Sequence, residues 1–200
     1  MTQLALIDLD GTVADYDRGM REGLLELQSP GEPPIEESLR ESPTWIEARR
    51  NLIRQTPGFW RKLPKLHRGF EIVAALRSLS FRLMVLSKGP MKNPGAWTEK
   101  LLWCQEHLPD AGVCIVSEPD AKGFVYGRVL VDDWPPFIQS WLDWRPTGLV
   151  IMPDHPYNRG FEHPQVVRYI GPNAPEAEWE ALMTRLKAAA HRSPPPPVPE

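Results

Sequence analysis

Residues 3–15 read Q-L-A-L-I-D-L-D-G-T-V-A-D, an apolar run that ends in two closely spaced acids and a glycine. The unbroken apolar run at residues 4–7 predicts a strand that is buried on both faces. Asp8 and Asp10 follow it directly, and Gly11 allows a tight turn beside a ligand. Crowded carboxylates repel each other unless a cation or a shared proton relieves them. The stretch indicates a nucleophile and a general acid/base with a hard cation such as Mg²⁺ between them, rather than a polar turn that only leaves the core.

The composition is that of an ordinary globular domain. The 200 residues suffice for one α/β domain with a modest insertion, and the net charge of −3 gives no electrostatic case for a nucleic-acid or membrane partner. Cys104 and Cys114 are too few for a disulfide framework and have no His at metal-ligand spacing. No signal peptide and no apolar run of membrane-spanning length are visible. We therefore expect a cytoplasmic protein with reduced thiols.

A helical segment separates the first strand from the next one. Apolar residues recur there at helical spacing in two groups: Met20, Leu24 and Leu27, then Trp45, Ile46, Ala48, Leu52 and Ile53. A further amphipathic helix is predicted at residues 69–79. We expect residues 16–79 to form a cap, with the last helix returning to the core, because an insertion beside an active site can exclude water and shape specificity.

Phe59 and Trp60 lie within the expected cap and allow two interpretations. Aromatic side chains in a helical insertion usually pack in its core, and composition favours this role. They could instead stack on a planar substrate, and we retain both as candidates for the substrate pocket.

Polar side chains follow several later apolar runs. Ser87 and Lys88 come after a predicted strand at 81–86, and the pair Asp132-Asp133 comes after one at 128–131, with Lys122 ten residues earlier. Further strands are predicted at 113–116, 148–152 and 166–170, the last at an edge. Ligands of open α/β sheets bind at the carboxyl ends of the strands, so these side chains are expected to meet there. The Asp pair could also cap the helix that begins near Pro135, which is compatible with metal binding.

The segment D-L-D-G-T-V-A-D at residues 8–15 resembles the first motif, D-x-D-G-T/V, of the haloacid dehalogenase (HAD) type phosphatases. In that superfamily the first Asp attacks phosphorus and the second handles the leaving-group proton, which implies these roles for Asp8 and Asp10. Ser87, Lys122 and the Asp pair match the later motifs in order. The resemblance implies a Mg²⁺ site of Asp8, Asp10 (through its carbonyl), Asp132 and Asp133, with Asp133 the direct ligand and Asp132 the outer one. It also implies phosphate contacts from Thr12, Ser87, Lys88, Lys100 and Lys122.

Three segments are similar to the 5'(3')-deoxyribonucleotidase branch of this superfamily. The segment P-G-F-W-R-K-L-P at 57–64 resembles an aromatic-rich lid that holds the nucleoside, and Lys100 stands thirteen residues after Ser87 in a Glu-Lys-x-x-Trp context. Lys100 could equally be a solvated helix residue. Residues 153–159 resemble a P-Y-N loop of bacterial and phage relatives. The chain departs from the branch at Ser87-Lys88-Gly89-Pro90, where relatives have Thr-Ser-Pro, so the local turn could differ.

The sequence therefore predicts an α/β fold with a doubly wound, mainly parallel sheet (a Rossmann-like HAD core) and a small inserted helical cap. Residues 1–15 and 80–192 are assigned to the core, 16–79 to the cap and 193–200 to a Pro-rich tail. The expected function is Mg²⁺-dependent hydrolysis of (deoxy)nucleoside monophosphates through an aspartyl-phosphate, without a stable nucleic-acid partner or a membrane. A homodimer is left open. The alternatives are a polynucleotide 3'-phosphatase of the same fold and a non-enzymatic binding module.

Overall fold

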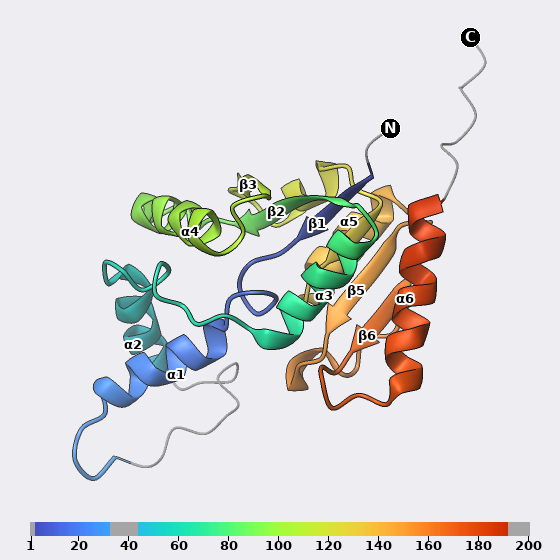
Figure 1. Ribbon diagram of the computed structural model, residues 1–200. Coiled ribbons are helices and arrows are strands. Elements are labelled where there is room, and N and C mark those ends of the chain that lie inside the picture. Colours follow the sequence, from blue (N-terminus) through green and yellow to red (C-terminus); the bar gives the residue numbers. More distant parts are fainter. Residues whose placement is uncertain (1–2, 33–43, 192–200) are drawn as a thin grey trace.

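The computed structural model describes residues 3–32 and 44–191, which form one six-stranded sheet with helices on both faces (Figure 1). All neighbouring strands are parallel, in the order β3-β2-β1-β4-β5-β6. The strands are β1 (Leu4–Ile7), β2 (Arg82–Lys88), β3 (Gly112–Val116), β4 (Val129–Val131), β5 (Leu149–Pro153) and β6 (Val166–Tyr169). The predicted α/β class and the edge position of the last strand are confirmed.

The described residues form six helices, which lie on the two faces of the sheet or beside it. They are α1 (Tyr16–Glu26), α2 (Thr44–Gln55), α3 (His67–Ser78), α4 (Pro94–His107), α5 (Pro135–Trp144) and α6 (Glu176–His191), with short 3₁₀ turns η1 (Asp120–Phe124) and η2 (Pro156–Asn158). Side chains alternate along β1, so Ala5 and Ile7 pack with α3, α4 and α6, whereas Leu6 packs with α5. Figure 1 shows α3 and α6 side by side over the same face. No helix within the described residues is long and apolar enough to span a membrane.

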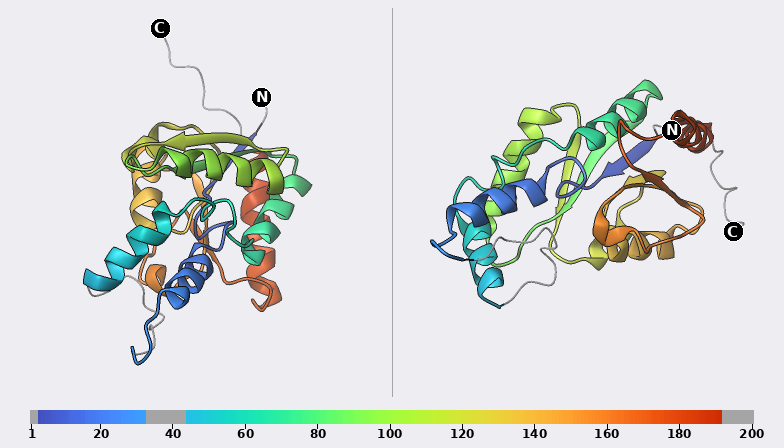
Figure 2. Two further views of the ribbon diagram at one scale, coloured as in Figure 1. Left: turned by 90° about the vertical axis from the view of Figure 1, so that its left-hand side faces the viewer. Right: turned by 90° about the horizontal axis from the view of Figure 1, so that it is seen from below.

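Helices α1 and α2 stand apart from the sheet, as both Figure 1 and Figure 2 show. They have a small core of their own, formed by Met20, Leu24, Ile46 and Ile53. The buried face of α2 is the one that carries the two isoleucines. Trp45 and Leu52, which share the helical repeat, are 42% and 57% exposed.

Helix α3 packs against the sheet through Ile72, Val73 and Leu76, as a helix that returns to the core should. The structure thus separates α1 and α2 from the elements around the sheet, and the division at residues 15 and 80 remains a proposal. The predicted Pro-rich tail at 193–200 lies outside the described residues.

The order of the strands creates a switch point between β1 and β4. The chain runs from β1 to β2 and β3 on one side and from β4 to β5 and β6 on the other, which opens a crevice at the carboxyl ends. Asp8 and Asp132 extend the pairing beyond their strands: Asp8 N–H donates to Val131 O at 2.8 Å, and Asp132 N–H donates to Ile151 O at 3.2 Å. The acids that follow β1 and β4 are therefore held next to each other.

Gly11 allows the turn after β1 to pass close to the acids after β4. Its φ is +83°, and a Cβ atom there would lie 2.7 Å from Oδ2 of Asp133. Gly69, at the start of α3, allows a second close approach, since a Cβ atom would lie 1.9 Å from Thr12 O. These glycines let α3 and the Asp133 loop enclose the turn at residues 10–14.

Candidate active site

Three buried carboxylates, from Asp8, Asp132 and Asp133, meet at the switch point. Each offers an oxygen within 4.8 Å of the oxygens of the other two. Lys122, fully buried, reaches this acid cluster from η1, and its Nζ donates to Asp8 Oδ1 at 2.7 Å and to Asp132 Oδ2 at 2.8 Å. The second oxygen of Asp132 accepts from Trp134 N–H at 2.9 Å. The Lys122 ammonium group is thus bonded to two of the three carboxylates.

Burial and mutual repulsion shift the pKa values of the groups in this cluster. Burial raises the pKa of Asp132 to about 8, against the attraction of Lys122, and raises that of Asp133 to about 7, with the charge of Asp8 adding to both. Burial lowers the pKa of Lys122, but Asp132 and Asp8 outweigh it and hold the pKa above its usual value. The acid cluster therefore favours a further positive charge.

Asp10 does not join the acid cluster. Its carboxylate pairs with Lys100 Nζ, which also donates to Ser87 Oγ at 3.0 Å and to the carbonyl of Lys88 at 2.7 Å. Lys100 is 1% exposed, so it is not a solvated helix residue. Burial raises the pKa of Asp10, and the charge of Lys100 opposes that shift. Asp10 and Ser87, although predicted for different roles, share one cation.

The loop after β5 holds the acid cluster from outside. Tyr157 O–H donates to Asp133, and Thr12 Oγ1 donates to Asp133 Oδ1 at 2.9 Å, so Thr12 binds a carboxylate here. Asn158 Nδ2 donates to the carbonyls of Asp133 and Pro153, both at 2.9 Å. These bonds explain the Tyr-Asn pair of the P-Y-N segment, whose roles sequence analysis left unassigned.

His155, in the same loop, holds the turn after β1. Its Nε2–H donates to Gly11 O at 2.7 Å, and its ring stacks on Tyr157 with centroids 4.7 Å apart. The Arg68 guanidinium lies 3.2 Å from Nδ1. Burial first, and then Arg68, lower the pKa of His155 to about 4, so the ring is neutral at pH 7.

A pocket of about 490 Å³ opens above these groups. Asp8, Asp10, Asp133 and Lys100 form its floor, and Lys88 also lines it. Five aromatic residues form part of its walls: Tyr16 and Trp60 come from the cap side, and Trp134, Phe137 and Tyr157 come from the side of the sheet. A pocket of this size and lining is typical of small-molecule sites.

Of the two aromatic candidates in the cap, Trp60 lines the pocket and Phe59 does not. The ring of Trp60 stacks on Tyr16 at 5.7 Å, and Lys100 Nζ lies 4.7 Å from its centroid. Phe59 stands edge-on to both rings and lines a separate groove with Ile53 and Leu63. The structure therefore places Phe59 behind the wall that Tyr16 and Trp60 form.

Two further residues of the cap wall, Arg50 and Arg54 on α2, are cationic and were not predicted from the sequence. Their spacing of four residues puts them on one helix face, but many solvated helix faces show the same spacing. Trp134 and Phe137 were missed for a similar reason. Only the fold brings these four residues to the predicted acids.

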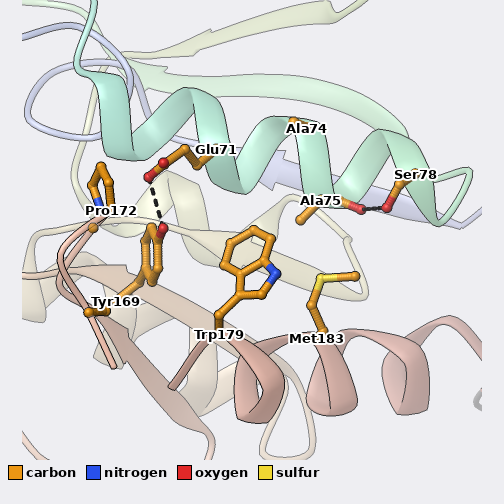
Figure 3. Close-up of a pocket in the computed structure, with 10 residues that line it drawn as sticks. Glu71, Ala74, Ala75, Ser78, Tyr169, Pro172, Trp179 and Met183 are labelled. Carbon is orange, nitrogen blue, oxygen red and sulfur yellow. Dashed lines mark hydrogen bonds between the residues drawn. The ribbon is translucent and has the colours of Figure 1, made fainter. Parts of the chain in front are cut away.

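A second cavity of about 510 Å³ lies between α3 and α6, away from the acid cluster (Figure 3). Trp179 and Met183 project from α6 toward α3, and Tyr169 O–H donates to Glu71 Oε2 at 2.8 Å across the gap. Its lining includes none of the predicted catalytic residues. The pocket above the acid cluster is therefore the candidate active site.

Comparison with protein families decides the assignment of the chain. Residues 2–169 match the model of the family described as 5' nucleotidase, deoxy (pyrimidine), cytosolic type C protein (NT5C). The chain belongs to the NT5C family. The match covers β1 to β6, and with them the acid cluster and the cap. The chain is thus a nucleotidase-like phosphatase of the HAD type, and the predicted resemblance is confirmed.

Solved structures share the fold of this NT5C-family chain at low sequence identity. One is a provisionally assigned HAD hydrolase of Bacillus subtilis, bound to magnesium. Its TM-score is 0.53 at 9% sequence identity, and the match covers 91% of this chain and 98% of the hydrolase. A Thermotoga maritima protein provisionally assigned as a β-phosphoglucomutase has a TM-score of 0.52 at 13% sequence identity, and the match covers 92% of this chain and 99% of that protein. CbbY of Rhodobacter sphaeroides, in complex with phosphate, has a TM-score of 0.50 at 15% sequence identity, and the match covers 84% of this chain and 93% of CbbY. A search of curated protein sequences gave no significant match.

The acid cluster of this NT5C-family chain fits a hard divalent cation. Its carboxylate oxygens are the donor type that Mg²⁺ prefers, and they are buried, crowded and served by a single ammonium group. Asp8, Asp132 and Asp133 supply the donors, while the Asp10 carboxylate is turned toward Lys100. The assignment of Asp133 as direct ligand and Asp132 as outer ligand stays a prediction.

Proposed function

We propose that the chain hydrolyses (deoxy)nucleoside monophosphates to nucleoside and phosphate, with Mg²⁺ and an aspartyl-phosphate on Asp8. The observation that carries the proposal is the acid cluster with its single lysine at the floor of an aromatic pocket. A nucleophile, an acid/base and phosphate-binding cations border one space large enough for a mononucleotide. Membership of the NT5C family supports the substrate class.

In the first step, an oxygen of Asp8 forms a bond to phosphorus, and the bond between phosphorus and the leaving oxygen breaks. Asp10 gives its proton to that oxygen. In the second step, Asp10 takes a proton from the attacking water, a bond from the water oxygen to phosphorus forms, and the bond to Asp8 breaks. Burial raises the pKa of Asp10, which favours the protonated acid needed first, while Lys100 favours the carboxylate needed second.

Four side chains would hold the phosphoryl group during both steps. Lys122 lies against Asp8, and Lys100 lies against Ser87 and Asp10, so both ammonium groups flank the attack position. Lys88 borders the pocket from the end of β2. Mg²⁺ held by Asp8, Asp132 and Asp133 would draw negative charge from the phosphoryl oxygens.

The leaving group would lie between the two aromatic walls. Trp60 and Tyr16 on one side and Trp134, Phe137 and Tyr157 on the other offer flat surfaces for a single base. The net charge of −3 gives no field that would draw in a polynucleotide. A free mononucleotide therefore suits the pocket better than the end of a nucleic acid.

A turnover screen with Mg²⁺ tests this proposal. The substrates are deoxynucleoside 5'- and 3'-monophosphates, an aryl phosphate, sugar phosphates and a 3'-phosphorylated oligonucleotide. We expect the highest kcat/KM for a deoxynucleoside monophosphate and no turnover in excess chelator. Faster turnover of the oligonucleotide would show that the chain is a polynucleotide 3'-phosphatase instead. If no phosphomonoester is turned over, the non-enzymatic binding module is the alternative that remains.

A further inference from the structure

The cap wall of the pocket carries two guanidinium groups that share one carboxylate. Arg54 Nη1 lies 3.0 Å from Glu47 Oε1, and Arg50 Nη1 lies 3.3 Å from Glu47 Oε2. Arg50 and Arg54 are 12% and 27% exposed, whereas Glu47 is 44% exposed, so solvent screens the acid more than the two cations. Of these three residues, the two cations line the pocket and Glu47 does not; Asp17, on α1, is the acid that lines the pocket on this side.

The guanidinium of Arg54 is fixed by hydrogen bonds at Nε and Nη1, which leaves Nη2 as the donor that could bind a ligand. Its Nε–H donates to the Tyr16 hydroxyl at 2.9 Å, and its Nη1 donates to Asn51 Oδ1 at 2.7 Å as well as to Glu47. Its backbone carbonyl accepts from Trp60 Nε1 at 3.1 Å and from Asn93 Nδ2 at 2.9 Å. Among the described residues, Nη2 of Arg54 donates to none. Because Nη2 and Nε–H lie on the same edge of a guanidinium, this donor is directed to the side of Tyr16.

The Tyr16 hydroxyl brings a second donor to the same place. Its oxygen accepts from Arg54, which leaves its own proton available, and no acceptor for that proton lies among the described residues. Tyr16 also borders the pocket beside Asp10, whose charge acts on the Tyr16 hydroxyl. Two donors, one of them on a guanidinium, thus lie close to the acid that would protonate the leaving oxygen.

We propose that Tyr16 and Arg54, supported by Arg50, form a subsite for a second anionic group of the substrate, carried by the sugar next to the scissile phosphate. This inference rests on the proposed function and narrows it to nucleotides such as nucleoside 3',5'-bisphosphates. A half-buried guanidinium with a fixed orientation is suited to phosphate or sulfate oxygens, which accept two donors at once. A neutral sugar hydroxyl would need no guanidinium beside the Tyr16 hydroxyl.

A matched pair of substrates tests the subsite. Thymidine 5'-monophosphate is compared with the same nucleotide carrying a 3'-O-sulfate, because the sulfate adds negative charge without adding a phosphomonoester. We expect kcat/KM to be at least tenfold higher for the sulfated nucleotide. The gain should fall below threefold in Arg54→Gln and should decrease in Tyr16→Phe, which keeps the ring and removes the hydroxyl.

Arg49→Gln is the matched control. Arg49 lies on the same helix and has the same charge, but it bonds Glu32 at 2.6 and 2.7 Å and does not line the pocket. This variant should keep the full gain. Unfolding midpoints and turnover of an aryl phosphate establish that each variant is folded, and Tyr16→Phe carries the test if Arg54→Gln does not fold.

Three outcomes would overturn the inference. Equal or slower turnover of the sulfated nucleotide by the wild type would mean that the cap wall does not select a second anion. A gain that persists in both Arg54→Gln and Tyr16→Phe would place the anion elsewhere. Turnover of the aryl phosphate without turnover of either nucleotide would reject the proposed function itself, and it would appear before any variant is compared.

Discussion

Replacement of Glu99 by glutamine should loosen the cap at the point where it contacts the sheet domain. Glu99 lies on α4, and its two carboxylate oxygens accept from the backbone N–H groups of Gly58 at 2.6 Å and Trp60 at 3.1 Å. The next residue, Lys100, bonds Asp10 and Ser87. Two adjacent residues of α4 therefore bond the loop that carries Trp60 and the polar residues at the floor of the pocket.

The expected magnitude follows from these two bonds. A hydrogen bond to a charged acceptor contributes about 1.5–3 kcal/mol, and glutamine can accept only one of the two, without charge. The loop retains the bonds of Trp60 Nε1 and Asn93 Nδ2 to the Arg54 carbonyl, so its docking should weaken by about 2 kcal/mol. Since 1.4 kcal/mol is tenfold, kcat/KM for nucleotides should fall by about 10- to 30-fold.

Steady-state kinetics with a nucleotide and an aryl phosphate measures this loss. KM for the nucleotide should rise because Trp60 is displaced, whereas turnover of the aryl phosphate, which contacts less of the cap, should change less than threefold. Glu106→Gln is the matched control, since Glu106 lies on the same helix and is exposed. If Glu99→Gln behaves like Glu106→Gln, the two hydrogen bonds from Gly58 and Trp60 to Glu99 do not position the cap.

Three further changes have defined outcomes. Lys122→Met leaves the buried carboxylates without their cation and should lower the free energy of unfolding by about 3–5 kcal/mol in urea titrations, part of which Mg²⁺ should restore; an unchanged midpoint would contradict the charge balance described for the acid cluster. The pKa of His155 is about 4 in the folded protein, below that of a free imidazole, so protonation favours the unfolded chain. The free energy of unfolding of the wild type should therefore fall by up to about 3 kcal/mol as pH falls from about 6.5 to about 4. His155→Gln should lack that part of the loss, and equal pH profiles would refute the assignment. Burial raises the pKa of Cys104 to about 12, so iodoacetamide at pH 8 should label the half-buried Cys114 first, as peptide mass spectrometry would show, and preferential labelling of Cys104 would contradict its burial.

The strands and most helices could be predicted from local patterns. The apolar runs before Asp8, Ser87 and Asp132 are strands because each is buried on both faces, and Asn93-Pro94 begins α4 because Asn93 Oδ1 accepts from Ala96 N–H at 3.3 Å. Helix faces were harder to predict. The buried face of α4 carries Lys100 and Trp103 while Leu101 is 39% exposed, because Asp10 and Ser87 compensate the buried charge.

Much of the site depends on contacts between distant segments. The motifs located the acids, Ser87 and Lys122, since each follows or precedes a strand at a recognisable spacing. Nothing local distinguishes Arg54 from Arg49, which lie on the same helix with similar neighbours, although only Arg54 lines the pocket. The separation of Trp60 from Phe59 likewise depends on Tyr16, more than forty residues earlier in the chain.

The central claim is that Asp8 carries the phosphoryl group, and acid-quench mass spectrometry during turnover tests it most directly. In the wild type with Mg²⁺ and a nucleotide, the peptide that contains Asp8 should gain the mass of one phosphoryl group. In Asp8→Asn, which keeps the size and removes the attacking charge, the adduct should be absent and kcat should fall by several orders of magnitude. Near wild-type turnover of Asp8→Asn, or a phosphoryl group on a different residue, would contradict the account.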